Sequence, residues 1–260
     1  MTVLIRLLGG LAVEVDGAPI DLPAATQRRA LIYLTIHANE VVGVDRLADA
    51  VWNGESPKQL EHAVHSLVYR LRRHLSVEPS AGSPGAHVDR VRPGYSLVID
   101  PTDVDANRFT ATTRQALEIL PRDPSATRTM LTEALELWRG DALLDVAYDD
   151  WAAAEIRRLT ETRLCACEAL ADANIVLGEP ELAIAELESL TERFPLRESL
   201  WVLLWKAMAA AGRHLDVTAS HRRAVKLLSS QFQIQPSPHL AELALRYGSA
   251  PTEGRPALRG

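Results

Sequence analysis

The sequence has 260 residues with a formal net charge of −6, and 47% of its residues are apolar. This balance excludes a histone-like protein that coats DNA through bulk charge, so any nucleic-acid site must be a local patch. The length is sufficient for two domains with separate cores.

No apolar run approaches the roughly 18 residues that span a bilayer, and residues 3–13 alternate as a strand does rather than as a signal peptide. The two cysteines are Cys165 and Cys167. Two positions apart on a helix, they point about 200° from one another and cannot readily form a disulfide or share a metal. We therefore expect a protein of a reducing cytoplasm, with no membrane partner and no cofactor.

Short strands are expected across residues 3–22, where Asp16-Gly17 provides a hairpin turn. Residues 27–38 then have helical periodicity. Arg28 and Arg29 lie near the start of this helix, where the helix dipole disfavours positive charge. Two interpretations are open: the arginines serve something other than stability, or they are solvated surface residues.

A second helix is predicted over 44–52, and a polar loop leads from it into a third helix over 58–75. The third helix has two contrasting faces. Its apolar residues recur at steps of three and four and fall within one arc of roughly 100°: they are Leu60, Val64, Leu67, Val68, Leu71 and Leu75. The opposite side carries donors and cations: Lys58, Gln59, His62, His65, Ser66, Tyr69, Arg70 and Arg73. Glu61 is placed at the edge of this side. An ordinary solvated surface helix has the same pattern, so the flanking sequence is needed to distinguish the two interpretations.

Those neighbours favour a nucleic-acid interface. A loop rich in Pro, Gly and Ser covers 78–86, and 87–99 reads as two strands around a basic turn. Strands, two helices, a basic helix and a basic hairpin are the plan of a winged helix, whose third helix enters the major groove. From Lys58 to Arg92 there are six Lys or Arg and three acidic residues, so this stretch is basic within an acidic protein.

The remainder of the chain is helical in pattern. Helices are expected at 105–120, 125–138, 150–177, 180–193, 200–211, 214–230 and 238–247. Gly178 and Gly212 are 34 residues apart, and each stands in the turn of a helix pair. A period of 34 with helix-turn-helix units indicates tetratricopeptide-like repeats, and a plain helical bundle is the alternative. The fold class is therefore mostly α: an N-terminal winged helix-turn-helix (α+β) followed by an all-α tetratricopeptide-like domain.

The ordered set of motifs resembles the actinobacterial antibiotic regulatory protein (SARP) family of transcription activators, which combine an OmpR-type winged helix with a bacterial transcriptional activator domain. The matching stretches are 7–13, 27–31, 41–47 with Val51-Trp52, 70–75, 92–97, 137–143 and 235–238. On this resemblance the winged-helix DNA-binding domain covers 1–100 and the activator domain covers 101–248. The segment 249–260 is expected to be a disordered tail.

The resemblance implies a sequence-specific activator, typical of antibiotic or other secondary-metabolite gene clusters. Such a regulator binds direct repeats in double-stranded DNA near the promoter, with protomers associating side by side, and recruits RNA polymerase. The loop Asn53, Gly54, Glu55 and Ser56 would contact the polymerase sigma subunit. His65, Ser66 and Tyr69 depart from the family's usual polar residues, so no target sequence is carried over.

Within the interface, Lys58, Gln59 and His62 are the candidates for base readout, because recognition helices read mainly with their N-terminal turns. The cationic residues Arg70, Arg72, Arg73, Arg90 and Arg92 are the candidates for backbone contacts, with Arg73 also able to reach a base.

Three alternatives to DNA binding can be compared with the sequence. His62 and His65 stand three apart on one helix but lack a third ligand at sensible spacing, so no metal site is predicted. A winged helix can bind protein instead of DNA, which leaves a protein-interaction module as the second function. No set of nucleophile, base and orienting group assembles, so an enzyme is not expected.

Overall fold

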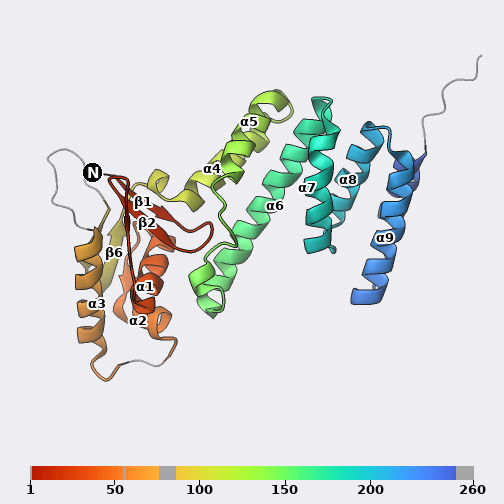
Figure 1. The fold of residues 1–260 in the computed structure, drawn as a ribbon. Helices are drawn as coiled ribbons and strands as arrows, with labels where there is room; N and C mark the ends of the chain where they lie inside the picture. The colour runs from red at the N-terminus through yellow and green to blue at the C-terminus, as the bar shows by residue number, and fades with distance from the viewer. Residues whose placement is uncertain (1, 55–56, 76–85, 250–260) are drawn as a thin grey trace, which may run out of the picture. The chain divides into compact units, whose positions relative to one another are not determined.

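The computed structural model describes residues 2–54, 57–75 and 86–249 (Figure 1). Within them the chain forms two compact units. Unit 1 contains residues up to 114 together with 133–163, and unit 2 contains 115–132 together with residues from 164 onward. Among the described residues, no helix combines the length and apolar character needed to cross a bilayer.

Unit 1 begins with a three-stranded antiparallel sheet made of β1 (Val3–Arg6), β2 (Ala12–Val15) and β3 (Ala18–Ile20). Val13 and Val15 are buried while Glu14 points to the other face, as the alternation predicts. The turn between β2 and β3 has positive φ at both Asp16 (48°) and Gly17 (80°). This is the backbone of a tight two-residue hairpin, so the predicted turn is confirmed.

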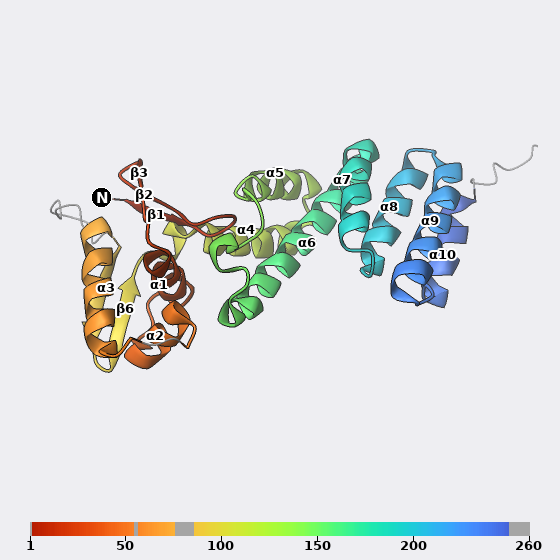
Figure 2. The ribbon, with the colours of Figure 1, turned by 60° about the horizontal axis from the view of Figure 1, so that its bottom comes forward.

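Three helices follow: α1 (Ala25–Ile36), α2 (Val44–Trp52) and α3 (Leu60–Leu75). They pack on one another through fully buried side chains such as Leu31, Leu47 and Leu67. A second sheet has the order β4 (Val42–Gly43), β6 (Gly94–Val98), β5 (His87–Val91). Figures 1 and 2 both show α3 alongside β6. The helix-turn-helix and its appended hairpin, the wing, are thus present as predicted.

The start of the third helix differs from the prediction. The helix begins at Leu60, and Lys58 and Gln59 lie in a turn before it. The physical reason lies in the backbone: the carbonyl of Gln59 accepts the N–H of Ala63 at 3.0 Å, which is the first bond of the helical ladder. Pro57 therefore stands three residues before the helix.

Residues 133–163 pack in unit 1 with the winged helix. α5 (Pro124–Leu135) ends earlier than predicted, and two short 3₁₀ turns, η2 (Leu144–Val146) and η3 (Asp150–Ala152), follow it. The Trp151 indole N–H donates to the carbonyl of Ala50 at 3.1 Å, and its ring meets Tyr33 edge-on at 5.0 Å. Trp151 therefore holds this segment against α1 and α2.

Arg28 and Arg29 have structural partners in the same segment. Arg28 Nε lies 2.9 Å from Asp145 Oδ1, and Arg29 Nε lies 3.0 Å from Asp149 Oδ2. Neither a solvated surface nor an external ligand is needed to account for them. Asp149 stands at the N-terminal end of η3, but its side chain makes no cap bond there and pairs with Arg29 instead.

Asp105 joins two parts of unit 1 that are far apart in sequence. After the 3₁₀ turn η1 (Pro101–Asp103), it opens α4 (Asp105–Ile119) and is buried. Its carboxylate accepts the N–H groups of Leu7 at 2.6 Å and Leu8 at 3.2 Å, just beyond β1. Burial raises the pKa of Asp105 above its ordinary value, although these bonds oppose the shift.

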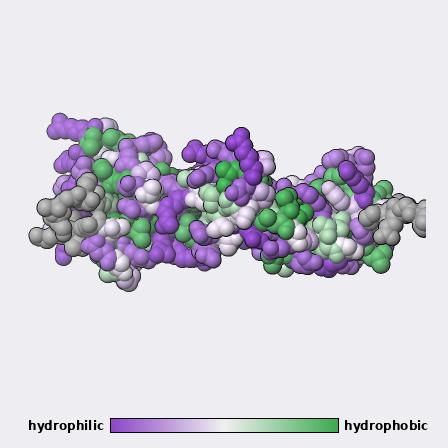
Figure 3. Space-filling view, turned by 90° about the horizontal axis from the view of Figure 1, so that it is seen from above, coloured by the Kyte–Doolittle hydropathy of each residue, from purple (hydrophilic) through white to green (hydrophobic). Residues whose placement is uncertain are grey.

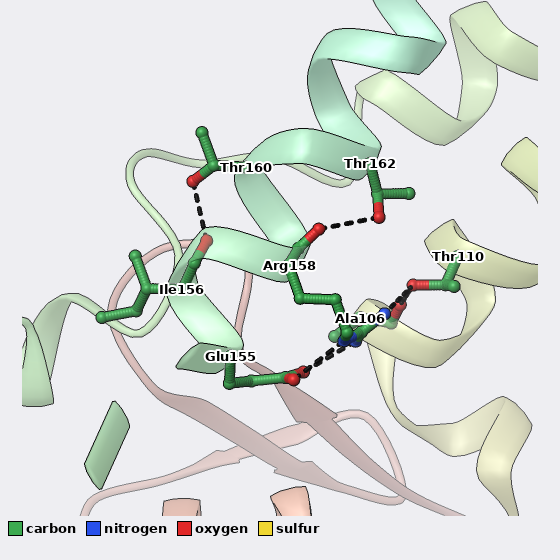
Figure 4. A network of polar contacts seen from close by, with 7 residues as sticks. All are labelled: Ala106, Thr110, Glu155, Ile156, Arg158, Thr160 and Thr162. Atoms are coloured by element: carbon green, nitrogen blue, oxygen red, sulfur yellow. Dashed lines mark hydrogen bonds and ion pairs between the residues drawn. The ribbon is translucent and has the colours of Figure 1, made fainter. Parts of the chain in front are cut away.

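A second link within unit 1 joins α4 to α6 (Ala153–Val176) (Figure 4). Arg158 donates two hydrogen bonds to Glu155, at 2.8 and 2.7 Å, and a longer one to Thr110 Oγ1 at 3.5 Å. The bond to Glu155 raises the pKa of the Arg158 guanidinium, because it favours the charged form. Glu155 thus holds the Arg158 guanidinium in place, and the Arg158–Thr110 contact joins α6 to α4.

Besides most of α5 and the second half of α6, unit 2 contains four helices: α7 (Pro180–Arg193), α8 (Glu198–Ala210), α9 (His214–Phe232) and α10 (Pro238–Gly248). Consecutive helices pack against each other, and Figure 2 shows α10 beside α9. Gly178 and Gly212 occupy equivalent turns with φ of 80° and 74°. Lys206 forms an ion pair with Asp172, also 34 positions earlier. This spacing agrees with the predicted period. Trp201 and Trp205 are fully buried in the core of this unit.

The surface is mixed in character. Figure 3 shows mostly hydrophilic residues on the face it displays, interrupted by smaller apolar patches. Single exposed apolar residues such as Tyr148 and Leu215 are found in both units. Scattered apolar side chains of this kind are normal on proteins and do not by themselves mark a site.

Candidate nucleic-acid interface

The two faces of α3 are as the sequence predicts. Val64, Leu67, Val68, Leu71 and Leu75 are buried, and burying side chains of this size stabilises each by about 1.5–3 kcal/mol. Polar and cationic residues cover the outer face. Those exposed on it are Glu61, His62, His65, Tyr69, Arg70 and Arg73. Lys58 and Gln59 are also exposed, in the turn before the helix.

The arginines of α3 have different surroundings. Arg73 makes no polar contact with other described residues, so its guanidinium is available. Arg70 folds back on its own helix, with Nε 3.3 Å from the carbonyl of Ser66. Arg72 is half-buried, and its Nε donates to the carbonyl of Val88 in β5 at 2.7 Å. Arg72 therefore also holds the wing against the helix, a role that the sequence pattern did not indicate.

His65 forms the second link between helix and wing. Its Nδ1 shares a hydrogen bond with the Tyr95 hydroxyl at 3.1 Å, and Tyr95 is buried in β6. Residues 94–97 of β6 are all buried, so the Tyr95 ring is enclosed while its hydroxyl reaches His65.

The wing presents Arg90 and Arg92 to solvent at the end of its hairpin. Val91 pairs with Gly94 across the turn, and Gly94 also pairs with Gly43 in β4. A Cβ on Gly94 would lie 1.8 Å from the carbonyl oxygen of Val42, so only glycine allows this close approach. The pairing of the sheet thus fixes the position of the hairpin end that carries the two arginines.

Between the wing and the first turns of α3 lies a hollow of about 390 Å³. Its wall contains charged or polar side chains from both elements, together with the backbone of the wing turn. The lining residues are Val44, Glu61, His62, His65, Arg90, Arg92, Pro93, Gly94 and Tyr95. The structure therefore brings together four of the residues predicted as DNA contacts, His62, His65, Arg90 and Arg92, and adds Glu61 to them.

Of the residues predicted to contact the polymerase, two lie outside this hollow and two lie outside the described residues. Asn53 and Gly54 are exposed, with φ of 51° and 85°, at the end of α2. Glu55 and Ser56 lie outside the described residues, as do most of the predicted loop at 78–86 and of the predicted tail. Across the described parts of the chain, no group of three or more His, Cys, Asp or Glu side chains is arranged to hold a metal ion.

Comparison with known proteins fits this architecture. Residues 17–97 match the model "Transcriptional regulatory protein, C terminal", and residues 104–246 match the bacterial transcriptional activator domain. The chain is 32% identical to the transcriptional regulator RedD of Streptomyces coelicolor, over 89% of this chain and 66% of RedD. It is 30% identical to MoaR1 of Mycobacterium tuberculosis, over 92% of this chain and 76% of MoaR1.

The fold is also similar to a solved structure, that of Mycobacterium tuberculosis EmbR in complex with a low-affinity phosphopeptide. The TM-score is 0.85 at 31% identity, over 94% of this chain and 64% of the EmbR chain. The chain thus spans slightly less than two thirds of the length of RedD and EmbR. With both domain models matched in order, the chain belongs to the antibiotic regulatory protein (SARP) family of bacterial transcriptional regulators.

Proposed function

We propose that this protein is a sequence-specific DNA-binding transcription activator that recruits RNA polymerase to the promoter of a biosynthetic gene cluster. What supports DNA binding most directly is the single surface formed by α3 and the wing. Arg90, Arg92 and His62 line one hollow there, and Arg73 is exposed farther along the same helix. A protein with a net charge of −6 must concentrate its attraction for phosphate in such a patch.

Division of labour along the surface follows from position. Lys58, Gln59 and His62, at the N-terminal end of α3, are assigned to base edges, which specify sequence. Arg70, Arg73, Arg90 and Arg92 are assigned to the sugar-phosphate backbone or its vicinity, which positions the protein. His65, Ser66 and Tyr69 complete the outer surface, with Tyr69 60% exposed.

A salt titration tests DNA binding and separates it from a protein-binding winged helix. If at least three phosphates are neutralised, the logarithm of the binding constant should fall with the logarithm of salt concentration at a slope of about −3 or steeper. Gln59→Ala and His62→Ala should weaken binding to the selected site more than to scrambled DNA. Arg73→Ala should weaken both alike. Arg157→Ala, an exposed cation on α6, serves as the charge-matched control. A flat salt dependence would favour the protein-interaction module.

Direct repeats and side-by-side association are part of the same proposal. One patch of this size offers few phosphate contacts, and a second protomer on an adjacent repeat would double them. Two protomers in tandem must face the same side of the duplex, so repeat spacing should follow the helical turn of about 10 base pairs. Inserting about half a turn between repeats should abolish cooperative binding and leave single-site binding unchanged.

We assign polymerase contact, through the sigma subunit, to residues 53–56, which follow α2 in the chain. Asn53 and Gly54 are exposed and do not pack in the core. Asn53→Gly tests this, because glycine keeps the positive φ of 51° while removing the side chain. DNA binding should be unchanged while transcription in a purified polymerase assay falls. Equal transcription at saturating protein would remove Asn53 from the contact.

A further inference from the structure

Among the described residues that line the hollow between α3 and the wing, Glu61 carries the one carboxylate. It lies in the first turn of α3 and is exposed. Two arginines and two histidines line the same hollow, yet Glu61 forms no ion pair or hydrogen bond with any described residue. Its oxygens are therefore unoccupied at the end of the helix that faces the bases in the proposed function.

We propose that Glu61 is a specificity-determining residue that reads a cytosine in the major groove. This rests on the proposed function of α3 as a recognition helix. An ionised carboxylate only accepts hydrogen bonds, so it is repelled by phosphate and requires an amino group. Cytosine offers its N4 amino group at the major-groove edge. Adenine also offers an amino group, N6, but with the acceptor N7 beside it, which repels the second carboxylate oxygen; guanine offers the acceptors N7 and O6 and thymine offers O4. Glutamate accepting from cytosine N4 is an established type of base contact.

The position of Glu61 beside cations makes this selective. Arg90 and Arg92 belong to the wing and line the same hollow as Glu61. If Arg90 and Arg92 bind the phosphates of one DNA strand, the Glu61 carboxylate on α3 faces the edges of the bases. A base without an amino group at that edge would place an acceptor against the carboxylate, which costs affinity.

A structural role for Glu61 gives a different result. A carboxylate in the first turn interacts favourably with the helix dipole and stabilises the helix, and its negative charge weakens phosphate binding through repulsion. Either effect changes affinity for all sequences by one factor. Only base readout changes the preferred base at one position and leaves the other positions of the motif unaltered.

The experiment selects bound DNA from a random pool with the full chain, then with Glu61→Gln and Glu61→Ala. Glu181→Gln removes an equivalent exposed first-turn carboxylate from α7 and is the matched control. The wild-type motif should contain a position at which cytosine is preferred about fivefold or more over guanine and thymine. Glu61→Ala should flatten that position. Glu61→Gln should move its preference toward adenine, since an amide pairs with adenine N6 and N7. The control should keep the wild-type motif.

Each outcome has a distinct meaning. If both Glu61 variants select the wild-type motif, or if all sequences gain or lose affinity by the same factor, Glu61 reads no base and the inference is wrong, while the proposed DNA binding stands. If the wild-type protein selects no motif and its binding is insensitive to salt, the proposed function itself fails.

Discussion

The Arg29–Asp149 pair offers a sharp test of how the winged helix is held. The guanidinium meets the carboxylate in a two-pronged contact, Nε to Oδ2 at 3.0 Å and Nη2 to Oδ1 at 3.1 Å. The two side chains differ in exposure, with 32% of Arg29 and 6% of Asp149 accessible to solvent. Removing each partner should therefore have unequal consequences.

In Arg29→Ala a nearly buried carboxylate loses its cation. Breaking a fully buried pair costs about 3–5 kcal/mol, and partial exposure of Arg29 reduces this to about 2–3 kcal/mol. In Asp149→Ala the guanidinium keeps access to water and lies 3.4 Å from the carbonyl of Val51, so about 1–2 kcal/mol is expected. The double variant should cost less than the sum by about 1 kcal/mol or more, because the partners are in contact.

Denaturant unfolding followed by circular dichroism measures these differences, provided that the slope with denaturant is the same for all variants. Arg157→Ala is the control; as an exposed cation with no polar contact in the described structure, it should change stability by less than about 0.5 kcal/mol. The reasoning fails if Arg29→Ala behaves like this control, or if the two single changes add up in the double variant.

Two further outcomes are expected. Arg72→Ala and Arg72→Lys should both lower the free energy of unfolding by about 1–2 kcal/mol, because lysine cannot reproduce the Nε bond to Val88. Denaturant unfolding curves measure this, and an unchanged stability of the lysine variant would contradict it. For Asp105, the raised pKa means that the folded state holds more protons than the unfolded state between the ordinary and the raised value, so its contribution to stability falls as pH rises through that window. Relative to Asp105→Asn, the wild type should lose unfolding free energy from about pH 4 upward, and the opposite slope would refute the sign.

Features with a local signal were predictable from sequence. The Asp16-Gly17 turn follows from two residues that tolerate positive φ, and the buried face of α3 follows from a three-four spacing. The turns at Gly178 and Gly212 follow in the same way from glycine at the end of a helix. In each case the residues that define the feature are neighbours in the chain, so the pattern is written within one short window.

Contacts between distant segments were not predictable. Arg29 and Asp149 are separated by 120 positions, and Leu7 and Asp105 by 98. The sequence shows that Arg29 lies at a helix start, where positive charge is unfavourable. Nothing in the neighbouring sequence shows which carboxylate it pairs with. The start of α3 was misplaced for another reason. Proline favours a helix start, but the backbone at 57–59 uses a turn instead, and propensity is a weak guide against such context.

The position of the family's two domains in sequence differs from the packing of the chain. The matched models meet between residues 97 and 104, whereas unit 1 also takes in 133–163. Asp145, Asp149 and Trp151 all lie in that added segment, and all three contact α1 or α2. The helices that support α3 are therefore braced by residues of the activator domain. A change at Asp149 or Trp151 should alter DNA binding only through the stability of this support, so its effect should be the same on selected and scrambled DNA. Effects confined to selected DNA should come from the turn before α3 and from its first turn, where Gln59, Glu61 and His62 lie.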